Sequence, residues 1–286
     1  MGFRIGNTEN SGYGNQGRRR GFKFLPIVIF GVFALIYYFG NRDVVPITGR
    51  SHVVGMSTDQ EMQLGLQSYR EVLNQNNVVT DGKYPALVKS VGERIAKVAD
   101  NNEFEWEFNV LESPEINAFC LPGGKVAVYT GILPVAQDED GLAVIMGHEI
   151  SHALARHGAE RMAHQRLAQL GQLALGMSVS DMDEGQRRAV MGAFGLGAQY
   201  GFMLPFSREH ESEADYMGLI LMARACFDPN KAPLFWERMA ESASRSGQPP
   251  EFMSTHPSSD TRIQQLREWM PKAMEERAKF CGDLVN

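Results

Sequence analysis

The sequence has little of what several protein classes need. Its 286 residues include only 3 cysteines, which excludes a disulfide-dense scaffold. Beyond residue 23 there is no cluster of basic residues, and the net charge is -6, which argues against a nucleic-acid partner. No repeat occurs at a fixed period. Hydrophobic residues make up 43% and charged residues 22%, which is typical of one large globular domain or two small ones.

One long uncharged run stands near the N-terminus. Residues 1–23 carry most of the clustered basic charge, and residues 24–40, FLPIVIFGVFALIYYFG, carry no charge at all. This length is at the lower limit for a membrane-spanning helix, which needs roughly 20 residues to cross a core of about 30 Å. Two tyrosines close the run, as in an interfacial belt, and Arg42 and Asp43 follow it. We therefore predict a disordered basic tail over 1–23 and a transmembrane anchor over 24–40.

Two other interpretations of this run remain open, a cleaved signal peptide and a buried core helix. No A-x-A motif follows the run, and no cysteine stands where a lipoprotein signal needs one, so we favour an uncleaved anchor. The positive-inside rule then places the tail in the cytoplasm and the rest on the periplasmic side of a bacterial inner membrane, in a single-pass arrangement. Residues 41–56 hold Pro46 and two glycines, and they are predicted to be a linker to a folded domain over 57–286.

The folded part is predicted to be α+β, mostly helical with a small antiparallel or mixed sheet. A capping-box pattern at Thr58 begins one helix, and alternating apolar residues indicate one strand. The expected helices cover 58–74, 85–98, a segment from 229 onward and 258–279, and the expected extended pieces are 104–110 and two parts of 117–130. Residues 167–204 are rich in glycine. We favour two small-residue helices packed beside the site over a mobile lid that touches the bilayer or the substrate.

The segment from Asp138 to His157, DEDGLAVIMGHEISHALARH, is predicted to be a helix that carries two histidines on one side. At the helical period His152 lies about 40° round from His148, on the face that also carries apolar residues. Two buried imidazoles need a polar partner, and a divalent cation is the natural one. The pattern H-E-x-x-H is that of zinc peptidases, and Glu149 points about 100° away, toward a water molecule. Two ordinary core histidines are the alternative.

A catalytic zinc site has three protein ligands and one open position, so a third ligand is needed. The acidic segment SREHESEADYMG, over 207–218, offers four carboxylates. If it is helical, Glu211 and Asp215 share a face with small or apolar residues, whereas Glu209 and Glu213 lie on the opposite, solvated face. Glu211 is therefore the expected third ligand. Asp215 is expected to hydrogen-bond a ligating histidine from behind.

The motifs HEISH, SREHESEAD and NAFCLPGG resemble those of the M48 metallopeptidases, in particular the branch of mitochondrial quality-control proteases and their bacterial periplasmic relatives. The resemblance implies a zincin-like domain. It implies that His148, His152 and Glu211 bind one Zn²⁺ per chain, with Glu149 as general base. It also implies that an edge strand beside the metal pairs with an extended polypeptide, for which Asn117, Ala118 and Phe119 are the candidates. The alternative for that segment is a core hairpin.

The C-terminal motif STHPSSDTRI supplies two further candidates. His256 is expected to donate to the oxyanion, with Arg262 second, because the family often carries H-P-x-x-x-x-R-I there. His256 as a fourth zinc ligand and as a plain loop histidine are the alternatives. Cys226 and Cys281 could form a bridge that leaves Cys120 free, although the sequence does not fix the pairing. The other histidines are expected at the surface or at helix ends, namely His52, His157, His164 and His210.

Together these features predict a membrane-anchored zinc endopeptidase that cleaves unfolded, misfolded or membrane-associated proteins in protein quality control. Its expected partners are extended polypeptides and the lipid bilayer. The sequence does not indicate whether accessory proteins take part. The alternative is a zinc-stabilised binding or chaperone-like module without turnover.

Overall fold

The computed structural model describes residues 21–246, 251–256 and 260–282. This part is mostly helical with two small sheets, which confirms the α+β class. The helices are α1 (Phe24–Gly40), α2 (Thr58–Gln75), α3 (Lys83–Ala99), α4 (Leu133–Ala136), α5 (Glu139–Leu154), α6 (His157–Ser178), α7 (Glu184–Ala198), α8 (Leu204–Arg224), α9 (Lys231–Ser246), α10 (Glu251–Thr255) and α11 (Asp260–Cys281), with short turns η1 (Thr130–Ile132) and η2 (Gln199–Met203). The strands are β1 (Arg42–Val44), β2 (Ser51–Val53), β3 (Val78–Val79), β4 (Glu107–Leu111), β5 (Ala118–Leu121) and β6 (Lys125–Tyr129).

The larger sheet is mixed and has the strand order β3-β4-β6-β5. Strand β4 runs parallel to β6, while β5 and β6 form an antiparallel hairpin in which Ala118 pairs with Val128. The turn between them contains Gly123 and Gly124, with φ angles of +85° and +79°. Residues with a Cβ atom disfavour this backbone conformation. The predicted pair of extended pieces around these glycines is therefore confirmed, with β5 at the edge of the sheet.

Helix α5 forms the centre of the hydrophobic core. Nearly all of its residues are buried, because β5, α3, α8 and α9 surround it. Its first turn is capped by Asp138, which accepts a hydrogen bond of 2.8 Å from the backbone N–H of Gly141. The sequence predicted a helix that continues to His157, but α5 ends at Leu154 and α6 begins at His157. The cause is Arg156, which has a left-handed φ of 54° that interrupts the helix.

The other predicted elements lie close to their expected positions. Helix α2 is capped by a capping box one residue earlier than expected, between Ser57 and Gln60. The expected helix from 85 is α3, and the expected strand at 104–110 is β4, which is shorter. The predicted start of the last helix at Ser258 lies outside the described residues, which resume at Asp260. The predicted tail, except for residues 21–23, lies outside them too.

Residues 41–56, predicted to be a linker, contain the two-stranded sheet β1–β2. The side chains of Val45, His52, Val53 and Val54 are buried against the rest of the molecule. This short hairpin therefore belongs to the folded part of the protein.

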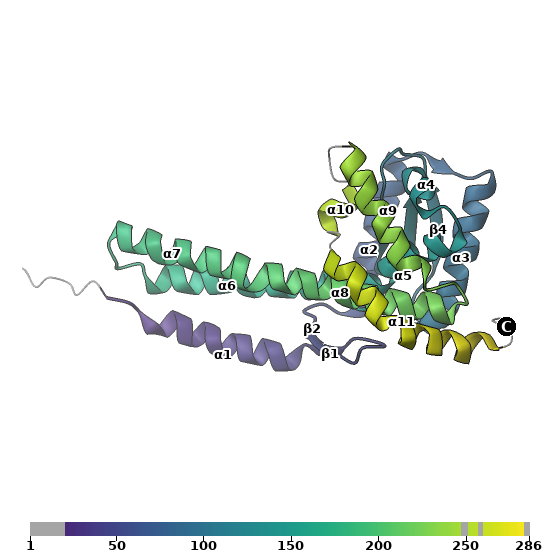
Figure 1. Ribbon diagram of the computed structural model, residues 1–286. Helices are drawn as coiled ribbons and strands as arrows, with labels where there is room; N and C mark the ends of the chain where they lie inside the picture. Colours follow the sequence, from purple (N-terminus) through teal and green to yellow (C-terminus); the bar gives the residue numbers. More distant parts are fainter. Residues whose placement is uncertain (1–20, 247–250, 257–259, 283–286) are drawn as a thin grey trace, which may run out of the picture.

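Helices α6 and α7 form a hairpin that extends away from the sheet, and α1 lies alongside α6 (Figure 1). The N–H of Lys23 donates to the carbonyl of Ser178 at 2.8 Å, so the start of α1 meets the end of α6. Helix α6 buries small residues against its neighbours, among them Gly171 and Ala174, whereas α7 has no buried residue. Small residues of α6 therefore pack against α1 and α7, but the hairpin projects away from the domain, so the prediction that these helices pack beside the site is wrong. Among the helices of the described ranges, none combines the length and the apolar character needed to cross a membrane.

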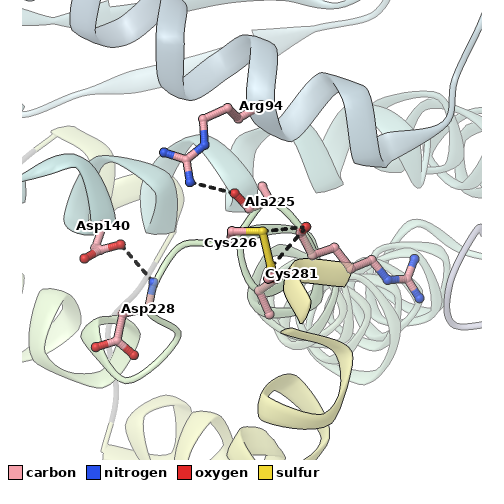
Figure 2. The surroundings of a disulfide bond; sticks show 8 residues. Arg94, Asp140, Ala225, Cys226, Asp228 and Cys281 are labelled. Atoms are coloured by element: carbon pink, nitrogen blue, oxygen red, sulfur yellow. Dashed lines mark hydrogen bonds between the residues drawn. A yellow bond between two sulfur atoms is a disulfide. The ribbon is translucent and has the colours of Figure 1, made fainter. Parts of the chain in front are cut away.

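A disulfide joins Cys226, just after α8, to Cys281 at the end of α11, and Cys120 is a buried free thiol. Figure 2 shows how the same turn is held from two further helices. Arg94 of α3 donates to the carbonyl of Ala225 at 2.8 Å, and the N–H of Asp228 donates to a carboxylate of α5, that of Asp140, at 2.8 Å. The C-terminal end of α8 is thus fixed against α3, α5 and α11.

Candidate active site

Helices α5 and α8 cross at two glycines, and this crossing sets the geometry of the site. A Cβ atom placed on Gly218 would lie 2.8 Å from the backbone nitrogen of His148 and 2.9 Å from the carbonyl carbon of Gly147. The two backbones can therefore approach this closely only because a glycine stands on each side of the contact. The close crossing brings the acidic face of α8 against the two histidines of α5.

Four side chains meet at this crossing with the spacing of a metal site. The group comprises His148, His152, Glu211 and His256, and one ligand atom from each lies within 4.8 Å of all the others. The Nε2 atoms of His148 and His152 are 3.1 Å apart, and they lie 3.4 Å and 3.5 Å from the carboxylate of Glu211. Zinc bonds of about 2.1 Å in a tetrahedron require ligand atoms about 3.4 Å apart. The three predicted ligands therefore fit a zinc ion.

His256 is the fourth member of the group. Its Nδ1 atom is 2.9 Å from both carboxylate oxygens of Glu211 and 3.3 Å from Nε2 of His148. Its ring stacks on Phe252 at a centroid distance of 4.5 Å. Of the roles considered for His256, this position matches that of a fourth ligand, whereas an oxyanion donor has to leave one metal position open.

Glu149 lies beside the group without belonging to it. Its side chain is 6% exposed, and Oε1 has no hydrogen-bond partner among the described residues. Nε2 of the His256 imidazole lies 3.7 Å from that oxygen. Burial raises the pKa of Glu149 above its ordinary value. A buried carboxylate oxygen without a partner, next to a metal-sized cluster, is the arrangement that a general base for water requires.

Asp215 and Arg262 support the cluster from behind. Oδ1 of Asp215 is 3.0 Å from Nδ1 of His148, which leaves Nε2 of that histidine facing the cluster, as the helical spacing predicted. Arg262 binds both oxygens of Asp215, one of them at 2.7 Å, and its guanidinium lies 3.4 Å from the ring centre of Trp236. Arg262 is buried and does not line the cleft described below. The structure therefore places it among the groups that hold His148.

The charges of the cluster are set by these contacts. Burial by itself raises the pKa of Glu211, but the hydrogen bonds with His148 and His256 outweigh burial and hold its pKa well below the usual range. Burial by itself and the neighbouring Arg262 lower the pKa of His148, yet its bonds with Asp215 and Glu211 raise it to about 9. Protons therefore compete with a metal ion for His148, and metal binding has to release them.

His157 and Glu213 are functional candidates that sequence reasoning missed. His157 is at a helix end, as expected, since it begins α6, but its side chain is only 4% exposed. We expected Glu213 on a solvated face, but its side chain is 6% exposed. Burial lowers the pKa of His157 to about 4, so its ring is neutral at pH 7. The arginine and histidine that follow HEISH are a signal that could have pointed to His157. Nothing in the helical spacing distinguishes Glu213 from the exposed Glu209.

The expectation of surface or helix-end positions is wrong for His52 in β2 and for His210 within α8, which are both buried. Glu160 lies between them, with Oε2 at 3.1 Å from His52 and 3.0 Å from His210. Buried imidazoles with a shared carboxylate belong to the interior of a protein rather than to its surface. These contacts tie β2 to α6 and α8.

A cleft of about 460 Å³ opens beside the cluster. Glu149, His152 and Glu211 form one wall, and the edge strand β5 with its preceding residue forms another, including Asn117, Ala118 and Phe119. Strand β5 pairs only with β6 in the described sheet, so its other edge has no strand partner there. The structure thus brings Asn117, Ala118 and Phe119 to the cleft, whereas Arg262, the fourth predicted substrate-binding residue, does not line it. A larger hollow of about 700 Å³, between α3 and β4, contains none of the cluster residues.

Comparison with known proteins gives the family. Residues 85–270 match the model of peptidase family M48. The chain is 40% identical over 246 residues to the mitochondrial metalloendopeptidase OMA1 of Schizosaccharomyces pombe, which covers 85% of this chain and 70% of that protein. Identity to human metalloendopeptidase OMA1 is 34% over 275 residues, covering 92% of this chain and 52% of that one. Identity to the β-barrel assembly-enhancing protease of Escherichia coli K12 is 31% over 234 residues, which cover 79% of this chain and 47% of that protein.

The chain thus spans about half the length of the human and E. coli relatives. The matched residues include both helices that build the cluster, α5 and α8, and the edge strand of the cleft. They also include His256 and Arg262. With the family model covering this whole site, the chain belongs to peptidase family M48 and is a metalloendopeptidase.

Proposed function

We propose that the chain is a zinc-dependent endopeptidase with a zincin-like site. In this proposal His148, His152 and Glu211 hold one zinc ion and Glu149 is the general base. The observation that carries the proposal is the buried Oε1 of Glu149, which has no partner among the described residues and lies beside ligand atoms spaced for zinc. Nitrogen and carboxylate ligands in this combination suit zinc.

The chemistry follows from the position of Glu149. Zinc, when bound, supplies Lewis-acid activation of a water molecule and of the scissile carbonyl. Glu149 takes the proton of the attacking water on its free oxygen and passes it to the leaving amine. Burial favours this role because the raised pKa of Glu149 brings it closer to neutral pH.

We propose that the substrate is an extended polypeptide that pairs with the free edge of β5. Main-chain hydrogen bonds to Asn117, Ala118 and Phe119 are independent of the substrate's sequence, so this mode requires an unfolded segment and gives broad specificity. Unfolded, misfolded or membrane-associated proteins provide such segments. The names of the relatives support a role in protein quality control, since one is described as assembly-enhancing for β-barrels.

A second candidate function is a zinc-stabilised binding module without turnover. It is favoured by the position of His256, because four protein ligands around zinc are typical of structural sites. In the enzyme proposal His256 closes the site at rest and must move away when substrate arrives. The partnerless oxygen of Glu149 favours the enzyme, since a structural site has no use for a buried base.

Replacement of Glu149 with Gln separates the two functions. We expect cleavage of casein to fall by about 100- to 10,000-fold, as is typical for the loss of a general base, while the zinc content stays the same. Turnover is measured by release of soluble peptides with and without a chelator, and zinc by metal analysis of the purified chain. Glu209→Gln, at an exposed position of α8, is the matched control and should change neither. Unchanged cleavage by the Glu149 variant would end the enzyme proposal.

We further propose that α1 attaches the chain to the bacterial inner membrane, with the catalytic domain on the periplasmic side. Helix α1 is uncharged and has no buried residue, and large apolar side chains cover it. Its 17 residues extend about 26 Å, a few Å less than a typical hydrocarbon core, and modest bilayer thinning covers such a mismatch. The Cys226–Cys281 disulfide supports the periplasmic side, because disulfides persist in oxidising compartments.

A further inference from the structure

A chain of hydrogen bonds leads away from the metal cluster through His152. Its Nδ1 atom lies 2.8 Å from Nδ1 of His157, and Nε2 of His157 lies 3.0 Å from a carboxylate oxygen of Glu213. A carboxylate only accepts, so Nε2 of His157 carries the proton and donates it to Glu213. Nδ1 of a neutral His157 is then an acceptor, and the N–H that it accepts belongs to Nδ1 of His152. This arrangement leaves the lone pair of His152 on Nε2, the atom that faces His148 and Glu211.

The far end of this chain is fixed by the β1–β2 hairpin. Glu213 accepts a hydrogen bond of 2.6 Å from the hydroxyl of Thr48, and Arg50 donates to it at 2.8 Å. Arg50 also binds both oxygens of Glu160, at 2.9 Å and 2.8 Å. Because the guanidinium is shared between two carboxylates that are largely buried, neither can turn away without leaving a buried charge unpaired. Glu213 therefore presents its oxygen to His157 in one orientation.

Thr48 and Arg50 lie outside the part of the chain that matches the family model, residues 85–270. They belong to the segment between α1 and the catalytic helices. Residues predicted to be a linker thus terminate a hydrogen-bond chain that ends on a metal ligand.

We propose that His157 and Glu213 are positioning residues that hold His152 in the tautomer and orientation needed to bind the metal, and that the β1–β2 hairpin fixes them through Thr48 and Arg50. The proposal rests on the proposed zinc site. It assigns no contact with substrate to any of these residues. Hydrogen-bond partners behind a ligating histidine typically contribute 10- to 100-fold to metal affinity.

The zinc affinity of the purified full-length chain tests this proposal. His157→Phe keeps an aromatic ring, which can stack on His210 as the imidazole does at 4.0 Å, but it removes the acceptor for His152. We expect zinc to bind about 10- to 100-fold more weakly, as measured by competition with a fluorescent chelator. We expect Glu213→Gln to show a smaller loss, because a neutral amide accepts more weakly. Thr48→Val, which removes one bond to Glu213, should show the smallest loss.

Glu209→Gln is the control for a carboxylate of α8 that lies outside the chain of bonds, and its zinc affinity should equal that of the unmodified chain. A cobalt-loaded sample gives a second measurement, because the visible absorption of Co²⁺ reports the ligand geometry. Thermal unfolding without metal shows whether each variant is folded. If His157→Phe does not fold, the comparison of Glu213→Gln with Glu209→Gln decides.

Wild-type zinc affinity in a folded His157→Phe chain would overturn the positioning role, and so would equal affinities of the two glutamate variants. The failure of the proposed function looks different. In that case the unmodified chain itself does not bind zinc, or its Glu149→Gln variant cleaves casein as well as the unmodified chain does.

Discussion

At the scale of single residues, the role proposed for His256 is to close the metal cluster at rest. Its Nδ1 lies 2.9 Å from Glu211, and as a fourth ligand it would take the position that a water molecule needs for catalysis. His256 directly follows the short helix α10, which ends at Thr255, so the position of its side chain depends on how α10 packs. The ring stacks on Phe252, and its Nδ1 contacts the Glu211 carboxylate.

Replacement of His256 with Ala removes one of four ligand atoms and leaves the other three. We expect zinc affinity to fall by at least about 10-fold, while zinc still binds at high protein concentration. Casein cleavage at saturating zinc should be retained, because the open position is then permanent. Chelator competition and a cleavage assay with added zinc check both expectations. Unchanged zinc affinity combined with reduced turnover is the result expected of an oxyanion donor and would contradict the role as a ligand.

The sequence was sufficient to predict the orientation of side chains whose partners lie on the same helix or on the face of a neighbouring helix. The helical period placed Glu211 and Asp215 inward, and both meet His148. It could not place Glu213, because Thr48 and Arg50, which neutralise and bury it, lie more than 160 residues away. A helix pattern describes which residues share a face, but not what a distant segment brings to that face.

At the scale of the elements, the crossing of α5 and α8 matters most. Both helices were predicted, and so was the side of each that faces the metal. The break between α5 and α6 was not predicted, because it depends on Arg156. That side chain binds Glu61 at 2.7 Å and Asp43 at 2.8 Å, and these two carboxylates come from separate elements. Such tertiary contacts stabilise a backbone conformation that local preference disfavours.

Gly218→Ala tests the crossing. The added methyl group would meet backbone atoms of Gly147 and His148, which cannot move aside as a flexible side chain can. We expect a loss of about 1–3 kcal/mol in the free energy of unfolding, together with weaker zinc binding because the ligands on the two helices are forced apart. Urea denaturation and chelator competition measure the two effects.

Gly192→Ala is the matched control for that substitution. It places the same methyl group on a helix, α7, where no atom lies within 4 Å. Alanine favours a helix over glycine by up to about 1 kcal/mol, so this variant should be as stable as the unmodified chain or slightly more stable. If the two alanine variants had equal stability, the close approach of α5 and α8 would not be the constraint described.

At the scale of the whole molecule, α1 and the α6–α7 hairpin form one projecting unit (Figure 1). The ion pair of 2.9 Å between Lys23 and Asp181 joins the start of α1 to the tip of the hairpin. Exposed apolar side chains lie on all three helices, for example Ile36, Leu173 and Leu196. Exposed apolar surface on adjacent elements marks a site of interaction with other molecules or with a membrane.

Deletion of residues 1–40 tests the attachment of the chain to the membrane. We expect the full-length chain to stay in the membrane fraction after an alkaline carbonate wash, and the shortened chain to be released, because α1 carries the largest apolar surface outside the domain. Immunoblots of the two fractions measure the distribution. Zinc analysis of the released chain shows whether the site is intact. Release of the full-length chain by the same wash would contradict the proposed anchor.

The Cys226–Cys281 disulfide closes a covalent loop of the chain that contains the C-terminal residues of the site. Linking residues 55 positions apart removes about 4 kcal/mol of unfolded-chain entropy. His256 and Arg262 both lie within this loop, whose base is the end of the helix that carries Glu211. A protease that cuts the backbone once inside the loop therefore releases no fragment, and the nicked chain keeps its mass until a reductant separates the two pieces. The disulfide thereby protects a peptidase against losing His256 and Arg262, one member of the metal cluster and one residue that supports it, to a single cut.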